Sequence, residues 1–193
     1  MIQKGGDTVS HPLLALLERD VVIPALKDER QLSALPDAQI VFLLCGDICN
    51  VDRLIERIHS AGKHAVVHAD LIAGLAPKEI AVDFLLRCGA DGVISTRPAL
   101  IRRGRELGML TVLRVFAIDS KAVRSLARES SLVTPDAVEV LPAVIPRVIE
   151  SLTKELEMPL IAGGLLSDKA DVTAALGAGA ICVSASDERL WAL

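Results

Sequence analysis

The chain has 193 residues, 51% of them hydrophobic, and a formal net charge of −4 at pH 7. This length predicts one domain over residues 1–193 that buries a core without disulfides or metals. No apolar stretch approaches the ~20 residues of a membrane span, and no targeting peptide opens the chain. We therefore expect a cytoplasmic protein with no membrane contact, whose overall charge attracts nucleic acid only weakly. Four cysteines without metal-ligand spacing are expected to be free thiols: Cys45, Cys49, Cys88 and Cys182.

Apolar, β-branched runs alternate with amphipathic stretches along the chain. Residues 10–19, within a lead-in segment over 1–20, are expected to form a helix whose leucines cover the floor of the fold. The apolar runs are rich in Val and Ile, as is typical of buried parallel strands. Eight strands are predicted: Val21–Ala25, Ile40–Cys45, Ala65–Ala69, Gly92–Ser95, Thr111–Phe116, Ala137–Leu141, Leu160–Ala162 and Ile181–Ser184.

Helical patterns fill the connections between these runs. In the second connection Val51, Leu54, Ile55 and Ile58 fall on one helical stripe. Strand–helix alternation requires right-handed crossovers and so a parallel sheet. Eight units favour a closed barrel over an open doubly wound sheet, because no Gly-x-Gly-x-x-Gly turn follows the first strand. The predicted fold class is α/β, a compact single (β/α)8 TIM-type barrel that ends in a short helix.

Polar residues stand at the carboxyl ends of several predicted strands, where such barrels carry their function. Arg114 and Glu139 lie inside apolar runs of adjacent strands, and a buried charge is costly unless it is paired. We expect these two side chains to meet, either to fix the inner layer or to bind a ligand. The candidates for the polar mouth are His68, Asp70, Ser95, Arg97, Arg114 and Glu139. By contrast, His59 and His64 are expected at the opposite end, either in structural roles or exposed to solvent.

Small residues end the last two strands. Glycines there allow the backbone to approach a phosphate, and the N–H groups of both loops could point at its oxygens. A short helix over residues 187–190 would add a favourable dipole. Because the loops after strands seven and eight are the recurrent phosphate site of this fold, we predict phosphate binding by Gly163, Gly164, Ser184, Ala185 and Ser186.

Several segments, each at a strand end, occur in the order known from one family. They are HADLIAG from His68, GVISTR from Gly92, RVFAID from Arg114, EVLP from Glu139, AGG from Ala162 and Ser-x-Ser-x-x-x-Leu-Trp over residues 184–191. With them the chain, from about Val22 onward, resembles the glycerol-3-phosphate-responsive antiterminator family. The resemblance implies a TIM barrel that regulates and is not an enzyme, with glycerol 3-phosphate as its effector and no cofactor. It also implies action on leader RNA, so that transcription passes a terminator in glycerol-use operons.

The resemblance further assigns roles to individual residues. Gly163, Gly164, Ser184 and Ser186 would hold the phosphate. Four charged residues would bind the glycerol hydroxyls or form the charge network of the mouth: Asp70, Arg97, Arg114 and Glu139.

Leader RNA would have to bind by electrostatics, because aromatic residues make up only 2% of the chain and platforms for base stacking are scarce. Two predicted outer helices carry basic residues that could form one RNA-binding face, and a homodimer would double it. The other interpretation is a solvated surface without a partner. The residues of this possible face are Arg102, Arg103, Arg105, Lys121, Arg124 and Arg128.

Two other functions are compatible with the residues. In a metal-assisted sugar-phosphate epimerase or isomerase, His68 and Asp70 would ligate a divalent metal together with Glu139 and Asp47. Against this, the predicted strand ends show no convincing lysine for Schiff-base chemistry and no second histidine ligand. The remaining alternative is a phosphate-binding barrel that signals through a protein partner.

Overall fold

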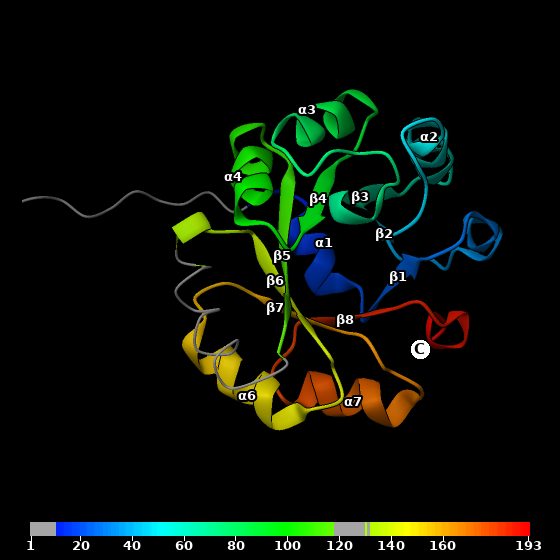
Figure 1. The fold of residues 1–193 in the computed structure, drawn as a ribbon. Coiled ribbons are helices and arrows are strands. Elements are labelled where there is room, and N and C mark those ends of the chain that lie inside the picture. The colour runs from blue at the N-terminus through cyan, green and yellow to red at the C-terminus, as the bar shows by residue number, and fades with distance from the viewer. Residues whose placement is uncertain (1–10, 118–129, 131) are drawn as a thin grey trace, which may run out of the picture.

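Eight parallel strands close into a barrel in the order of the chain, with β8 paired to β1 (Figure 1). The computed structural model describes residues 11–117, 130 and 132–193. The closed barrel confirms the predicted (β/α)8 fold and excludes the open sheet. Its strands are β1 Val22–Leu26, β2 Ile40–Leu43, β3 His64–His68, β4 Gly92–Ser95, β5 Leu110–Phe116, β6 Ala137–Leu141, β7 Leu160–Gly163 and β8 Cys182–Ala185.

Helices surround the strands as an outer ring (Figure 1). The α-helices are α1 Leu14–Arg19, α2 Val51–Ser60, α3 Ile80–Arg87, α4 Pro98–Glu106, α6 Pro146–Glu155 and α7 Lys169–Gly177. Short 3-10 helices follow three strands: η1 Glu29–Ala34, η2 Ala69–Leu71 and η3 Glu188–Leu190. The predicted short final helix is therefore present as η3. Within the described residues, every helix is too short or too polar to cross a membrane.

The barrel interior is filled by alternate residues of the strands, since successive side chains of a strand point to opposite faces. Ile23 and Ala25 of β1 belong to this inner cluster, whereas Val22 and Leu26 pack outward under the helices. Leu17 of α1 is fully buried in the same inner cluster. The short lead-in helix therefore covers the barrel floor, as the sequence predicts.

Aspartates reinforce the floor, at the amino ends of the strands. Asp91 accepts a hydrogen bond from the backbone of Ala65 at 2.8 Å, and Asp136 accepts one from Thr111 at 2.8 Å. Each carboxylate thus satisfies an N–H group at the start of a neighbouring strand. His59 and His64 both contact Asp91, at 2.8 and 3.2 Å. These two histidines therefore lie at the floor and not at the mouth.

Candidate functional site

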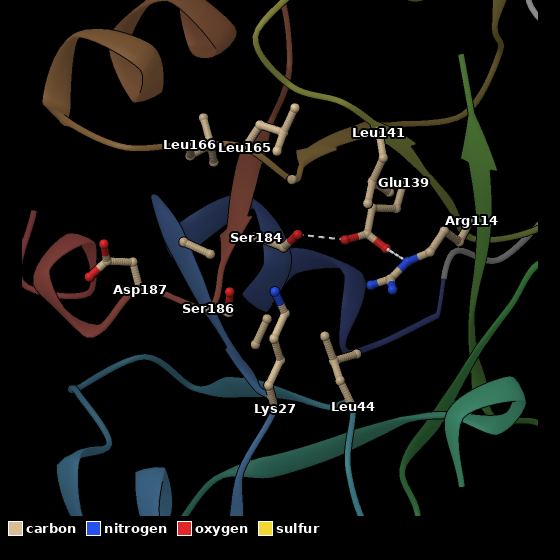
Figure 2. A pocket seen from close by; sticks show the side chains of 13 residues that line it. Lys27, Leu44, Arg114, Glu139, Leu141, Leu165, Leu166, Ser184, Ser186 and Asp187 are labelled. Carbon is tan, nitrogen blue, oxygen red and sulfur yellow. Dashed lines mark hydrogen bonds and ion pairs between the residues drawn. The ribbon is translucent and has the colours of Figure 1, made fainter. Parts of the chain in front are cut away.

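A pocket of about 120 Å³ opens at the carboxyl ends of the strands (Figure 2). Residues from β1, β5, β6 and β8, and from the loops that follow β1, β2, β7 and β8, form its walls. They are Ala25, Lys27, Leu44, Arg114, Glu139, Leu141, Gly164, Leu165, Leu166, Ser184, Ala185, Ser186 and Asp187. The pocket thus includes four of the five residues predicted to hold a phosphate.

The base of the pocket is a buried charge network. Arg114 Nε donates to Glu139 Oε2 at 2.6 Å, and Ser184 Oγ donates to the other carboxylate oxygen of Glu139. The Glu139 side chain is fully buried and that of Arg114 is only 8% exposed. The predicted pairing of these charges is therefore confirmed. Because Glu139 is bonded through both oxygens, its charge is balanced within the protein.

Gly163 of β7 lies between the strands that carry Glu139 and Ser184. A Cβ atom at this position would lie 2.5 Å from Ser184 Oγ and 2.8 Å from Glu139 Oε1. The missing side chain is what allows these two groups to meet across β7. Gly163 therefore supports the base of the pocket and is not among its lining residues, and its contact with a phosphate stays a prediction.

The loop after β7 turns sharply at the pocket rim. Gly164 and Leu165 have positive φ values of 77° and 62°, a conformation that favours glycine and that other residues adopt rarely. The carbonyls of Gly163 and Gly164 accept hydrogen bonds from the Ala143 N–H at 2.7 and 3.1 Å. Among the described residues, the N–H groups of Gly164, Leu165 and Ser186 have no protein acceptor. All three residues line the pocket.

The short helix η3 does not offer its amino end to the pocket, contrary to the prediction. Asp187 occupies that end, because its carboxylate accepts the Arg189 N–H at 3.0 Å. Hydrogen bonds from the Arg189 side chain and backbone lower the pKa of Asp187 to about 2. Asp187 is therefore ionised and paired with Arg189. It places a negative charge in the loop that follows β8.

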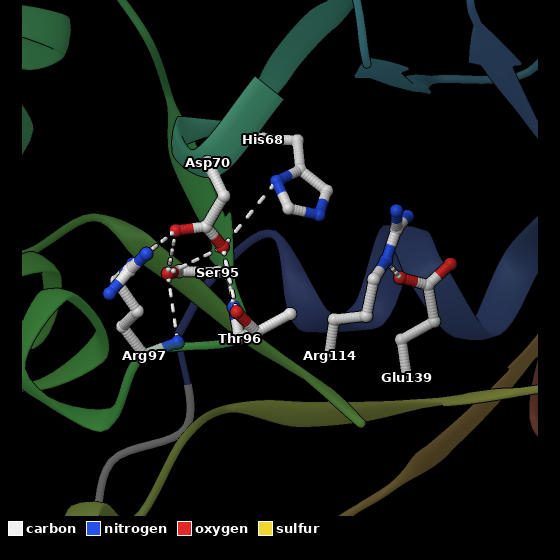
Figure 3. A network of polar contacts seen from close by, with 7 residues as sticks. All are labelled: His68, Asp70, Ser95, Thr96, Arg97, Arg114 and Glu139. Carbon is white, nitrogen blue, oxygen red and sulfur yellow. Dashed lines mark hydrogen bonds and ion pairs between the residues drawn. The ribbon is translucent and has the colours of Figure 1, made fainter. Parts of the chain in front are cut away.

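A second polar cluster lies on the rim at the ends of β3 and β4, outside the pocket lining (Figure 3). Asp70 accepts hydrogen bonds from Ser95 Oγ at 3.0 Å, the Thr96 N–H at 2.7 Å and Arg97 Nε at 3.1 Å. These bonds tie η2 to the loop between β4 and α4. The cluster satisfies its own members, so Asp70, Ser95 and Arg97 serve as a rim clamp in this structure.

His68 lies between this clamp and the buried pair, with its ring facing both (Figure 3). Its side chain is 3% exposed, and Nδ1 lies 3.8 Å from Asp70 Oδ2 without a hydrogen-bond partner in the described part of the chain. Burial, together with the nearby positive charge of Arg114, lowers the pKa of His68 to about 4. The imidazole is therefore neutral at pH 7.

The metal site required by the epimerase alternative is not assembled. Within the described residues, no group of three or more His, Cys, Asp and Glu side chains could hold a metal ion. Asp47 instead accepts a hydrogen bond from the Cys49 N–H at 2.8 Å, within its own turn. Asp70 is held in the rim clamp and Glu139 in the buried pair, and His68 lies between the two.

In the proposed RNA face, Arg103 of α4 is paired with acidic side chains of α3 and α4. Arg103 binds Asp83 at 2.5 Å and Glu106 at 2.9 Å, and Arg105 donates to the Thr134 carbonyl. Arg102 is exposed. The remaining members of the face lie outside the described residues: Lys121, Arg124 and Arg128. The described half is therefore less basic than its sequence suggests.

Among the pocket residues that the sequence analysis missed, Lys27 is the basic one. The first strand was expected to end at Ala25, but β1 extends to Leu26, so Lys27 directly follows a strand end and lines the pocket. A lysine therefore does stand at a strand end, although nothing here tests it for Schiff-base chemistry. A lysine immediately after a buried apolar run was the available signal.

Fold and pocket together define a (β/α)8-barrel protein with a small polar site where such barrels recurrently bind phosphate. The family of the chain follows from sequence comparison. The model of the glycerol-3-phosphate responsive antiterminator family matches residues 22–191, and the chain belongs to this family.

Relatives and solved structures agree with this assignment. The chain is 36% identical over 185 residues to the uncharacterized protein YgcP of Escherichia coli strain K12, covering 94% of this chain and 97% of that protein. It is 33% identical to a glycerol uptake operon antiterminator regulatory protein of Listeria monocytogenes, with a TM-score of 0.85 over 89% of this chain and 94% of the other.

A glycerol uptake operon antiterminator-related protein of Thermotoga maritima is 31% identical, with a TM-score of 0.82 and coverage of 90% and 99%. An aldolase, QR15, superimposes with a TM-score of 0.70 over 89% of this chain and 92% of the other, but at 11% identity it shows a shared fold alone.

Proposed function

We propose that this protein is a transcription antiterminator that binds glycerol 3-phosphate at the barrel mouth and then acts on leader RNA of glycerol-use genes. Family membership supports the regulatory class. The observation that carries the ligand is the pocket, a small cavity lined by residues whose N–H groups have no protein acceptor in the described chain. Such a regulator works in the cytoplasm, where leader RNA is transcribed.

In this proposal the phosphate lies against the loops after β7 and β8. The N–H groups of Gly164, Leu165 and Ser186 supply hydrogen bonds to its oxygens, as backbone donors do in other anion sites. The glycerol end then points toward Arg114 and Glu139 at the pocket base. Arg114 has further guanidinium donors beyond the one given to Glu139, and these can reach a hydroxyl oxygen.

The first experiment is calorimetric titration of the purified, metal-stripped protein with glycerol 3-phosphate. Free glycerol and inorganic phosphate serve as controls, because each carries only part of the proposed contacts. Saturable binding of the ester, much tighter than that of either fragment, is expected. If the ester binds no better than glycerol, or only after a divalent metal is added, the sensor function is wrong.

Leader RNA binding is tested with the ligand-saturated protein. Because the contacts would be electrostatic, the logarithm of affinity is expected to fall linearly with the logarithm of salt concentration. Charge reversal of Arg124 and Arg128 should abolish RNA binding while glycerol 3-phosphate still binds. Retained RNA binding in that double variant would exclude this face. A homodimer, if formed, would present the face twice, and sedimentation in the presence of RNA measures that stoichiometry.

A further inference from the structure

Of the four charged side chains that line the pocket, three have an ion-pair partner among the described residues and Lys27 does not. Arg114 and Glu139 neutralise each other at 2.6 Å. The carboxylate of Asp187 is held by Arg189 at 2.5 Å. Lys27, an exposed residue, has no ion-pair partner within the described part of the chain. One positive charge in the pocket is therefore left without a counterion from the described protein.

The Lys27 side chain extends into the pocket, and its nitrogen points toward Ser184 and Ser186 (Figure 2). This direction brings the ammonium toward the end of β8 and the loop that follows it, where Ser186 lies. A compact ammonium group is a common phosphate partner in proteins, where it acts as a point charge.

Gln31 of η1 fixes the backbone from which Lys27 extends. Its Oε1 accepts the Lys27 N–H at 2.9 Å, and its Nε2 donates to the Ser186 carbonyl at 3.0 Å. The amide of Gln31 thus joins the loop after β1 to the loop after β8. Asp28 anchors Gln31 in turn, because the Asp28 N–H also donates to Oε1, at 3.3 Å. The position of Lys27 relative to Ser186 is therefore set by hydrogen bonds.

We propose that Lys27 is the residue that selects a doubly charged phosphate monoester as the ligand of this pocket. The inference rests on the proposed function and names the side chain that gives it charge specificity. A monoester carries a charge of about −1.5 to −2 at pH 7. The backbone N–H groups can donate to any small anion, but the free charge of Lys27 favours the dianion over a monoanion or a neutral polyol.

The test compares Lys27→Met, Lys27→Arg and wild type by calorimetric titration with glycerol 3-phosphate at pH 7.5 and pH 5, on either side of the second phosphate pKa of about 6. Lys154→Met is the matched control, since it removes an equal charge from an exposed site on α6, where Lys154 pairs with Glu150. Thermal denaturation of each variant confirms that it is folded.

Lys27→Met is expected to bind the ester at least about tenfold more weakly at pH 7.5. It should also lose most of the wild-type preference for pH 7.5 over pH 5. Lys27→Arg, which keeps the charge, should retain most of the affinity, and Lys154→Met should bind as the wild type does.

Lys27→Met binding within twofold of the wild type would overturn this inference and leave the proposed function standing. Equal losses in Lys27→Met and Lys27→Arg would also overturn it, because the charge would then not be the selecting feature. If the wild-type protein itself binds no phosphate monoester, the proposed function fails and the inference fails with it.

Discussion

Gly163 occupies a position in β7 where there is no room for a side chain. An added Cβ would approach both Ser184 Oγ and Glu139 Oε1 to within 2.8 Å. Gly163→Ala is therefore expected to lower the free energy of unfolding by about 1–3 kcal/mol, and to weaken ligand binding by displacing the pocket base. Urea unfolding followed by circular dichroism measures the first effect.

Gly177→Ala is the matched control for this substitution. Gly177 ends α7, and a Cβ there would meet nothing within 4 Å. Its replacement should be neutral or stabilising by about 0.5–1 kcal/mol. Similar losses of stability in both variants would show that crowding at the pocket base is not the cause.

The buried imidazole of His68 makes stability depend on pH. Its pKa is lowered from the usual 6.5 to about 4, so the unfolded chain takes up a proton at a higher pH than the folded protein. The stabilising contribution is complete above pH 6.5 and is lost as pH falls toward 4. The free energy of unfolding should fall by at most about 1.4 kcal/mol per pH unit in this window.

His68→Gln is expected to flatten this part of the pH profile, measured by urea unfolding at pH 7, 6, 5 and 4. The Asp28 and Asp187 carboxyls have pKa values lowered to about 2, so their protonation changes stability only at pH values below this window. If His68→Gln keeps the wild-type slope of unfolding free energy against pH between pH 6.5 and 4, other groups cause the pH dependence.

Among the elements, the strand starts depend on the floor aspartates. Asp136 accepts hydrogen bonds from both the N–H and the hydroxyl of buried Thr111, at 2.8 and 2.7 Å. Asp136→Ala removes the carboxylate that accepts both of these hydrogen bonds. The free energy of unfolding should therefore fall by about 1–3 kcal/mol. Glycerol 3-phosphate affinity of the folded variant should stay within twofold, because the pocket opens at the other end of the barrel.

Asp37→Ala removes the same charge from an exposed position just before β2. Such surface changes usually alter stability by less than about 0.5 kcal/mol. If calorimetry shows that Asp136→Ala loses ligand affinity while still folded, the floor and the mouth are coupled and the independence assumed here is wrong.

Periodicity and composition were sufficient to predict all eight strands, with ends wrong by at most two residues. Arg114 and Glu139 could be paired in advance because they occupy adjacent strands, and the barrel places them side by side in register. The bond from Ser184 to Glu139 could not be foreseen, because it crosses an intervening strand and depends on the barrel stagger and on the small size of Gly163.

The predicted end of the first strand also explains why Lys27 was not included among the site residues. An end placed one residue early, at Ala25 in place of Leu26, hid the position of Lys27 at the pocket. In the same way, the local pairing of Asp187 with Arg189 depends on side-chain geometry that spacing alone does not show.

For the whole molecule, ligand binding should appear as added thermal stability, because the ligand binds only the folded barrel. Glycerol 3-phosphate at 100 times its dissociation constant contributes about 2.7 kcal/mol. For a chain of this size, that corresponds to a rise in Tm of about 5–10 °C, measured by differential scanning calorimetry. Glycerol at the same concentration should give no comparable rise, and an equal rise would show that the phosphate is not recognised.

The same barrel architecture occurs in enzymes, as the superposition with an aldolase at 11% identity shows. The scaffold therefore does not decide between catalysis and sensing, which depend on the side chains at the strand ends. In the described part of this chain, the barrel mouth holds the rim clamp, whose members bond one another, and the buried Arg114–Glu139 ion pair. It also holds Lys27, which has no ion-pair partner there.

The final turn of the chain has a practical consequence. Trp191 is buried, and its indole N–H donates to the carbonyl of Ala185, a pocket residue at the end of β8, at 2.8 Å. The chain contains one tryptophan and no tyrosine. Its intrinsic fluorescence therefore comes almost entirely from a single indole bonded to the pocket wall, and an emission change on adding ligand would report events at that wall without any label.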